Sequence, residues 1–215
     1  MTVSSLVPLE TRSKPVQKRS QERIDQILAA AGDLLASAPT EQITTTFIAE
    51  RAGIPVSSVY RYFPNVFSIY NSLFETVSAD QVDRIIAIVE GVDALPQWRA
   101  RFLAVVQYLR RSIDEHPFHR PLLKAIFAHP ELDGAKERMC NSISAVIADR
   151  WRRGEDGFSG ADPDIVATIT MRIFLSVEAY LVNENDPAVR DQYFEQLVIN
   201  LESYLSKYLS DDPRS

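Results

Sequence analysis

The stretch Thr44–Tyr70 constrains the fold of this chain more than any other segment. It reads TTTFIAERAGIPVSSVYRYFPNVFSIY, and it contains two i,i+4 apolar pairs, Ile48–Ala52 and Val59–Phe63. This spacing predicts two short helices that pack at a steep angle around a shared core. Gly53 falls where the first helix must end, in a left-handed conformation that glycine adopts cheaply, and Pro55 presets the backbone for the next helix. We therefore predict a helix-turn-helix.

The second helix of this motif has a mixed outward face. Once the apolar pairs are assigned to the interior, the side chains left facing mostly outward are Val56, Ser57, Ser58, Arg61 and Tyr62. A short helix with such a face suits the major groove of DNA, where hydroxyl groups bond base edges and a valine contacts a thymine methyl group. We expect Arg61 to reach guanine or phosphate, and Tyr62 to hydrogen-bond a phosphate.

The same segment resembles the DNA-binding signature of the tetracycline-repressor (TetR) family of bacterial regulators. The residues in register are Thr44, Ile48, Ala49, Ala52, Gly53, Tyr60, Tyr62 and Phe63, with conservative Ile54 and Val59. The resemblance implies that Thr45 and Thr46 touch phosphate or base, and that Val56, Ser57, Ser58, Tyr60 and Tyr62 lie at contact positions. For Tyr60, partial burial against the first helix is an equal alternative. Pro55 and Ser57 depart from the family pattern, and Val66 replaces a phosphate-binding lysine, so no phosphate contact is assigned to Val66.

The distribution of charge fits a DNA-binding N-terminal part. The net charge of the 215 residues is −6, but residues 1–75 carry equal numbers of basic and acidic side chains, so the acidic excess lies in the remainder. The segment Arg12–Arg23 contains five basic residues and one acidic residue, Glu22; the basic residues are Arg12, Lys14, Lys18, Arg19 and Arg23. Local charge sets the attraction to phosphate, so we expect Lys18 to contact DNA, with a solvated basic arm as the alternative.

Helix-breaking and helix-capping residues along the chain predict three regions. Residues 1–17 are expected to form a mobile basic arm, residues 18–64 a helix-turn-helix head, and residues 65–215 a second, all-helical domain. A first helix at about 20–36 would cover the motif with an apolar stripe of Ile24, Ile27, Leu28, Ala31, Leu34 and Leu35. Asn65 is expected to cap a long helix to about residue 90, which in the family couples the two domains. A break at 91–96 and helices at about 97–115, 120–127, 135–153, 162–183 and 187–209 follow, with Asp162-Pro163 and Asp186-Pro187 as start signals.

The last two helices are the candidates for a dimer interface. The first has an apolar strip at four-residue spacing, Ile165, Ile169, Ile173, Val177 and Leu181. The second has Phe194, Leu197, Val198, Leu201, Tyr204, Leu205 and Tyr208 at intervals of three and four. Two such helices from each of two chains would make a four-helix interface, and two heads match a palindromic operator. The alternative is that both strips pack inside one chain.

The second domain carries many aromatic residues, most of which we expect in its core. Because the family uses this bundle to enclose an apolar small molecule, the resemblance makes several of them candidates for lining an effector pocket: Trp98, Phe102, Tyr108, Phe127, Met139, Phe174 and Glu178. Glu178 is the candidate polar anchor, with a position at the dimer surface or a salt bridge to Arg172 as alternatives.

The sequence carries no catalytic constellation and predicts neither a metal nor a cofactor. His116, His119 and His129 lie near Glu115 and Glu131, but Pro117 interrupts helical continuity, so loop histidines or pocket lining are favoured over a metal site. The single cysteine, Cys140, fits a reducing cytosol and a buried helix face. The segment GEDGFSG, 154–160, is expected to be a surface loop.

These observations predict a ligand-responsive regulator of transcription, most simply a cytoplasmic repressor that binds duplex DNA as a homodimer and is released by a small molecule, with no membrane partner. The alternatives are an activator or a regulator without an effector. Less favoured are an all-helical enzyme and an interaction protein that has lost contact with DNA.

Overall fold

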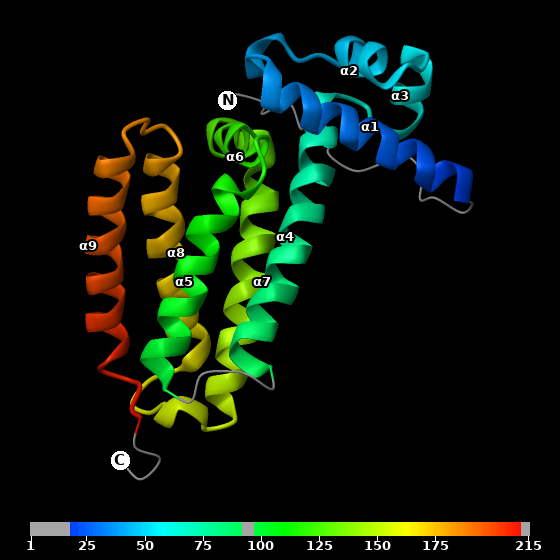
Figure 1. Cartoon of the computed structure of the whole chain (residues 1–215). Helices are drawn as coiled ribbons and strands as arrows, with labels where there is room; N and C mark the ends of the chain where they lie inside the picture. Colours follow the sequence, from blue (N-terminus) through cyan, green and yellow to red (C-terminus); the bar gives the residue numbers. More distant parts are fainter. Residues whose placement is uncertain (1–17, 92–96, 212–215) are drawn as a thin grey trace, which may run out of the picture. The chain divides into compact units, whose positions relative to one another are not determined.

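The computed structural model describes residues 18–91 and 97–211. Every regular element in these residues is helical, which confirms the all-α prediction. The α-helices are α1 (Lys18–Ser37), α2 (Thr45–Ala52), α3 (Val56–Tyr62), α4 (Val66–Glu90), α5 (Trp98–Glu115), α6 (His119–Ala128), α7 (Asp133–Arg152), α8 (Pro163–Leu181) and α9 (Pro187–Leu205) (Figure 1). The 3-10 helices are η1 (Thr40–Gln42), η2 (Pro130–Leu132) and η3 (Glu155–Gly157). The predicted arm, 1–17, and residues 92–96 of the predicted break lie outside the described residues.

Helix starts follow the predicted capping signals. Asn65 caps α4, because its Oδ1 accepts the backbone N–H of Ser68 at 2.9 Å. Asp162 and Asp186 each accept the backbone N–H two residues ahead at 2.9 Å, and α8 and α9 then begin with proline. Caps of this kind satisfy N–H groups that have no partner inside the helix, and each contributes about 1 kcal/mol of stability.

The described chain forms two compact units. The head unit consists of residues 18–77 and 114–136, and the bundle unit consists of residues 78–91, 97–113 and 137–211. The head unit is larger than the predicted 18–64 because it also includes the first half of α4 and the whole of α6. Gly32 of α1 illustrates the packing of α6, since a Cβ atom built at Gly32 would lie 3.5 Å from the ring of Phe118 at the start of α6.

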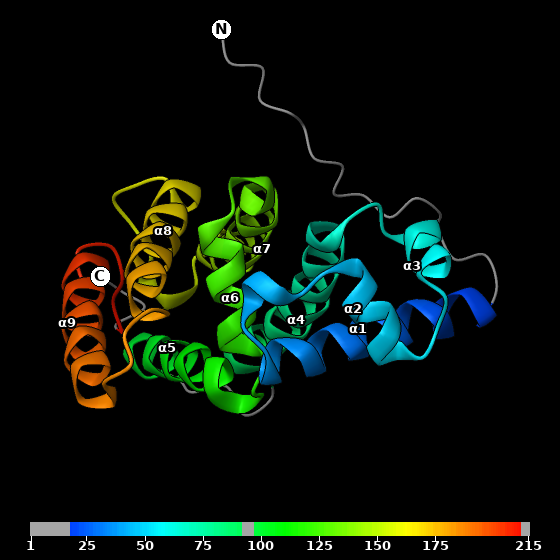
Figure 2. The same ribbon diagram turned by 90° about the horizontal axis from the view of Figure 1, so that it is seen from above.

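The core of the head unit lies between α1 and the helix pair α2–α3. Most of the apolar stripe predicted on α1 is buried: Ile24, Ile27, Ala31, Leu34 and Leu35. Ile48, Val59 and Phe63 are completely buried beside it. Nε2 of Gln26 donates to the carbonyl oxygen of Ala52 at 2.7 Å, which joins α1 to the end of α2. In Figures 1 and 2, α1 runs along α2, which in turn packs against α3.

In the bundle unit, α8 and α9 lie side by side (Figures 1 and 2). The apolar strip of α9 packs inside the protomer, since Phe194, Leu197, Leu201 and Leu205 are all buried. The strip of α8 differs, because its first two members are exposed, Ile165 by 58% and Ile169 by 39%. The described helices include none that is long and apolar enough to cross a membrane. Cys140 is buried on α7, as predicted, and burial raises the pKa of its thiol.

Two glycines of the head unit give a matched test of its packing. We expect Gly53→Ala to lower the free energy of unfolding by about 1 kcal/mol, because Gly53 has φ +65° and alanine is strained there. We expect Gly32→Ala to raise it by about 0.5–1 kcal/mol, because an added methyl group makes ordinary contact with Phe118 and favours the helix. Urea denaturation followed by circular dichroism measures both, and equal signs would contradict the described backbone.

Candidate nucleic-acid interface and bundle cavity

The pair α2–α3 has the local geometry of the predicted helix-turn-helix. Thr44 caps α2 by accepting the backbone N–H of Phe47 at 3.1 Å. The helix ends at Gly53, whose backbone is left-handed, and the N–H of Ile54 closes the turn on the carbonyl oxygen of Ala49 at 3.0 Å. Because Ile54 is buried, the turn is fixed by packing as well as by hydrogen bonds. The turn therefore holds α3, and with it the outward residues of α3, in a fixed orientation relative to α2.

Most of the predicted DNA-contacting residues on this pair are exposed. Val56, Ser57, Tyr60 and Arg61 of α3 are exposed, Ser58 is half-buried, and Thr46 at the start of α2 is exposed. Tyr60 is 43% exposed, and its phenol oxygen accepts a hydrogen bond from Thr45 of α2, so its position is compatible both with DNA contact and with the alternative of partial burial against the first helix of the motif. These side chains give α3 a face of hydroxyl groups, one phenol and one guanidinium, which are groups of the kind that hydrogen-bond to DNA bases and phosphates in protein–DNA complexes.

Two of the predicted contact residues lie inside instead. Tyr62 was expected to face outward, but it is only 6% exposed. It follows Val59 by three residues, which places it on the same buried face of α3, and the guanidinium of Arg61 lies 5.7 Å from the centre of its ring. Thr45 is also buried, and its hydroxyl donates to the phenol oxygen of Tyr60 at 2.8 Å. Thr45 therefore orients Tyr60.

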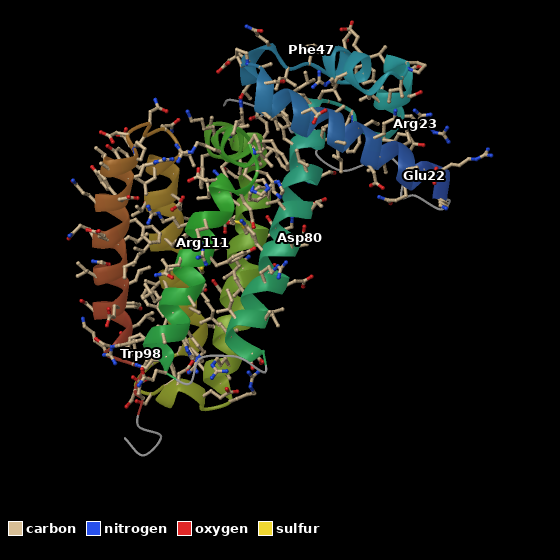
Figure 3. All side chains as sticks on the ribbon, in the orientation of Figure 1. Glu22, Arg23, Phe47, Asp80, Trp98 and Arg111 are labelled. Carbon is tan, nitrogen blue, oxygen red and sulfur yellow. The ribbon has the colours of Figure 1, made fainter. Side chains whose placement is uncertain are left out.

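The positive charge near this face comes from α1 and α3. Lys18 and Arg19 are exposed at the start of α1, and Arg61 is exposed on α3. Arg51 is less available, because its Nε lies 3.5 Å from Oδ2 of Asp33. Sequence reasoning missed Phe47 on α2, labelled in Figure 3, which is exposed by 37%. The sequence does contain an indication of this exposed ring, because Phe47 is an aromatic residue next to Ile48 but is not a member of the buried apolar pairs of the motif.

The bundle unit contains a cavity of about 60 Å³ that is partly open to solvent. It is lined by the last turn of α4, by α5, α7, η3 and α8, and by α9 and the residue Leu209 after it: Val89, Trp98, Arg101, Phe102, Val105, Ile147, Arg150, Trp151, Asp156, Thr170, Leu205 and Leu209. Most of these side chains are apolar or aromatic. Both tryptophans of the chain lie on the wall of this cavity. Nε1 of Trp98 is buried and has no hydrogen-bond partner among the described residues.

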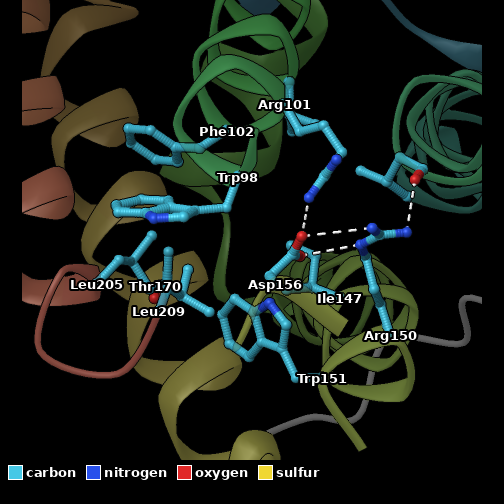
Figure 4. Close-up of a pocket in the computed structure, with 12 residues that line it drawn as sticks. Trp98, Arg101, Phe102, Ile147, Arg150, Trp151, Asp156, Thr170, Leu205 and Leu209 are labelled. Atoms are coloured by element: carbon cyan, nitrogen blue, oxygen red, sulfur yellow. Dashed lines mark hydrogen bonds and ion pairs between the residues drawn. The ribbon is translucent and has the colours of Figure 1, made fainter. Parts of the chain in front are cut away.

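A buried charge cluster closes one end of the cavity (Figure 4). Arg101 of α5 donates from Nη2 to Oδ1 of Asp156, while Arg150 of α7 donates from Nε to Oδ2 of Asp156 at 2.9 Å. Nη1 of Arg150 also donates to the carbonyl oxygen of Val89 at 2.9 Å. The side chains of Arg101 and Asp156 are only 8% and 6% exposed. The cluster therefore joins the end of α4, α5, α7 and η3 through charge-assisted hydrogen bonds.

The backbone at Asp156 is shaped to bring its carboxylate inward. Asp156 has φ 61°, a left-handed conformation that aspartate adopts more readily than most residues. Its carbonyl oxygen accepts the backbone N–H of Ser210 at 2.9 Å, which fixes η3 against the segment after α9. The predicted surface loop 154–160 thus contributes an inward side chain. Burial lowers the pKa of the Arg101 guanidinium, and the positive charge of Arg150 lowers it further.

Some of the residues predicted to line an effector pocket do line this cavity, and others do not. Trp98 and Phe102 line it, whereas Tyr108, Met139, Phe174 and Glu178 of the bundle unit are not among its lining residues, and Phe127 belongs to the head unit. Sequence reasoning missed Arg101, Arg150, Trp151 and Asp156. A signal for Arg101 existed, since it lies on the same face of α5 as Trp98 and Val105, which are buried.

The histidines form aromatic contacts. The ring centres of His116 and His119 are 4.8 Å apart, and His129 lies 4.8 Å from the ring of Phe67. In the part of the chain that the structure describes, no group of three or more His, Cys, Asp or Glu residues is placed to hold a metal ion.

Comparison with known proteins places these features in context. The model of the family described as bacterial regulatory proteins, tetR family, matches residues 27–65. The nucleoid occlusion factor SlmA of Alteromonas mediterranea is 33% identical over 163 residues, covering 72% of this chain and 80% of that protein. The SlmA of Marinomonas sp. is 31% identical over 132 residues, covering 61% of this chain and 64% of that protein, so this match spans less than two thirds of the relative.

Solved structures share the fold. SmeT, the repressor of the Stenotrophomonas maltophilia multidrug efflux pump SmeDEF, superposes with a TM-score of 0.66 at 20% identity, covering 91% of this chain and 95% of SmeT. SmeT has also been solved as a complex with triclosan. A TetR-family transcriptional regulator from Pectobacterium atrosepticum superposes with a TM-score of 0.68 at 17% identity, covering 91% of this chain and 98% of that chain.

Proposed function

Because the chain belongs to the TetR family, whose members are DNA-binding regulators rather than enzymes, we propose that it controls transcription as a homodimer on a palindromic operator. The observation that carries this proposal is the exposed face of α3, which is held on a rigid helix pair. In our proposal the regulator is a repressor, and a small molecule bound in the bundle cavity releases it. It acts in the cytoplasm, where the bacterial chromosome lies.

The chemistry of the head unit supports specific rather than purely electrostatic binding. Ser57, Tyr60 and Arg61 offer hydrogen-bonding groups to base edges and phosphates, and Val56 offers an apolar contact for a thymine methyl group. Lys18 and Arg19 add sequence-independent attraction to phosphate. One head makes few contacts, so tight binding requires two heads on two half-sites.

Exposed apolar residues support the dimer. Of the ten large hydrophobic residues that are exposed in the described chain, five lie on α8 and α9: Ile165, Ile169, Tyr180, Tyr193 and Ile199. A second copy that covers these side chains removes apolar area from water, which is the main driving force of association. The buried strip of α9 supports each protomer from within.

The bundle cavity supports control by a small molecule. It is mostly apolar with a few charged groups at one end, which is the usual composition of a ligand site. The triclosan complex of SmeT gives a precedent for an aromatic ligand in a protein of this fold. Release from DNA then requires that the ligand bind the DNA-incompetent state more tightly than the DNA-bound state. An activator, or a regulator without an effector, remains the alternative within this class.

Nucleoid occlusion is a second candidate role. The observation that favours it is the 33% identity to SlmA of Alteromonas mediterranea, which extends over 163 residues and therefore well beyond the helix-turn-helix. Occlusion over a nucleoid requires binding sites spread along the chromosome, whereas a transcriptional regulator requires sites at promoters. Mapping the bound sites on the chromosome separates these two roles.

Substitutions on α3 and α1 test the assigned DNA face. We expect Arg61→Ala or Ser58→Ala to change the preferred half-site, with a cost of about 1–3 kcal/mol on the original operator. We expect Lys18→Ala to weaken binding to all duplexes alike and to lower the salt slope by about one. Fluorescence anisotropy with a panel of duplexes measures both effects. If neither α3 variant changes the preference while both remain folded, the recognition face is assigned wrongly.

A further inference from the structure

The bundle cavity has two chemically different ends. Most of its wall is apolar, and the hydroxyl group of Thr170 is turned toward its own helix, donating to the carbonyl oxygen of Val166 at 2.8 Å. The charged lining residues gather at one end, where the guanidinium groups of Arg101 and Arg150 converge on Asp156 (Figure 4). A ligand that fills this cavity must therefore combine an apolar body with a group that suits the charged end.

The charged end favours an anion. Two guanidinium groups and one carboxylate line it, so the lining residues carry a net positive charge, while Glu155 and Glu90, which pair with Arg150 at 2.6 Å and 3.6 Å, lie outside the lining. Both oxygens of Asp156 already accept hydrogen bonds, Oδ1 from Arg101 and from Nη2 of Arg150 at 3.3 Å, and Oδ2 from Nε of Arg150 at 2.9 Å. A ligand cation would meet a carboxylate that is already engaged and two repelling guanidinium groups. A ligand anion would meet guanidinium groups that are shielded from water, where charge-assisted hydrogen bonds are strong.

We propose that the cavity binds an apolar molecule that ends in a carboxylate or a similar monoanion, and that this anion binds Arg101 in competition with Asp156. The effect on DNA binding rests on the proposed effector function of the same cavity. The anion loosens the link between α5 and η3, because Arg101 supplies that link through its bond to Asp156. Asp156 thus acts as an internal counter-ion that holds the charged end together when no ligand is present.

Variants of the two partners should have opposite effects on the affinity for the anion. Arg101→Gln removes the charge that binds the ligand, so we expect it to weaken anion binding by about tenfold or more. Asp156→Asn removes the competing charge but keeps the shape and tolerates the left-handed backbone, so we expect tighter anion binding. A loss of folding alone would weaken binding in both variants. Arg152→Gln is the matched control, because Arg152 is an exposed arginine of α7 outside the cavity.

Calorimetry with two sets of probes on the full chain tests the proposal. The probes are cinnamate and decanoate, each compared with the amide and the primary amine of the same carbon skeleton, and circular dichroism confirms that each variant is folded. We expect the carboxylates to bind at least about tenfold more tightly than their amides, with the preference lost in Arg101→Gln, increased in Asp156→Asn and kept in Arg152→Gln. Equal affinities, preference for the amines, or no binding of any probe would overturn the proposal.

A parallel measurement of DNA affinity separates this inference from the proposed function. If the carboxylates show the expected preference but leave DNA affinity unchanged, the anion site stands and the effector role of the cavity fails. If the amides release DNA as well as the carboxylates do while binding equally, the effector role stands and the anion site fails.

Discussion

Replacing Ile165 and Ile169 of α8 with glutamate is expected to convert the proposed homodimer into monomers and to weaken operator binding by about 100-fold or more. The two isoleucines are 58% and 39% exposed in the protomer, so the substitutions leave the core of each protomer intact. In the proposed interface, however, four carboxylates would be buried without partners, which is costly. A monomer carries one head, and the loss of the second, linked head lowers affinity by about 10²–10⁴-fold.

Sedimentation gives the oligomeric state, and anisotropy on a palindromic duplex gives the affinity. The matched control is Ile86→Glu on α4, which introduces the same charge at an apolar residue of similar exposure, 38%, on a helix that lies across the bundle unit from α8 and α9 in Figure 1. This control should remain dimeric and bind DNA normally. A double variant that is folded and still dimeric would rule out α8 as part of the interface.

Asp156→Ala is expected to lower the free energy of unfolding by about 3–5 kcal/mol. The carboxylate is the shared acceptor for Arg101 and Arg150, and the side chains of Asp156 and Arg101 are almost completely buried. Removal of one partner from a buried ion pair leaves a charge in the interior without compensation, and the cost of that arrangement exceeds the net value of the pair itself. The alanine also keeps an unfavourable left-handed backbone.

Guanidinium denaturation followed by circular dichroism measures this effect. Asp156→Asn should cost less, because it retains an acceptor for the arginines. Asp164→Ala is the control, since Asp164 forms an exposed ion pair with Arg152 and such pairs contribute about 1 kcal/mol or less. Equal stabilities of the Asp156→Ala and Asp164→Ala variants would contradict a buried charge cluster at the end of the cavity.

The parts of the fold that depend on local signals could be predicted from the sequence. Asn65, Asp162 and Asp186 cap helices as predicted, because a cap is formed by neighbours in the chain. Gly53 ends α2 for the same kind of reason. The boundaries of the two compact units were harder to predict from the sequence. The inclusion of α6 in the head unit depends on packing between residues that are distant in the chain, such as Gly32 and Phe118.

The candidate sites were predictable where exposure follows helical periodicity. Val56, Ser57 and Arg61 face outward as expected, since the apolar pairs fix the inner face of α3. The outward position predicted for Tyr62 was wrong. Its polar hydroxyl group suggested an exposed side chain, but its ring packs at the end of the inner face of α3.

The charged end of the cavity was missed for a different reason. Arg101 and Asp156 are 55 residues apart in the chain, and only the folded bundle brings them together. Asp156 also lies in a glycine-rich segment whose composition is typical of a surface loop. Its carboxylate points inward because the backbone at Asp156 is left-handed, and the composition of the segment does not indicate that conformation.

Selection of bound duplexes from a random pool with the intact protein tests whether a dimer reads a palindromic operator through α3. We expect an enriched sequence with two inverted half-sites whose centres lie about one helical turn apart, at about 10 base pairs. We also expect the retention of duplexes to fall steeply with salt. Enrichment of a single half-site, or of no sequence at all, by a folded and dimeric protein would contradict palindromic reading by a dimer.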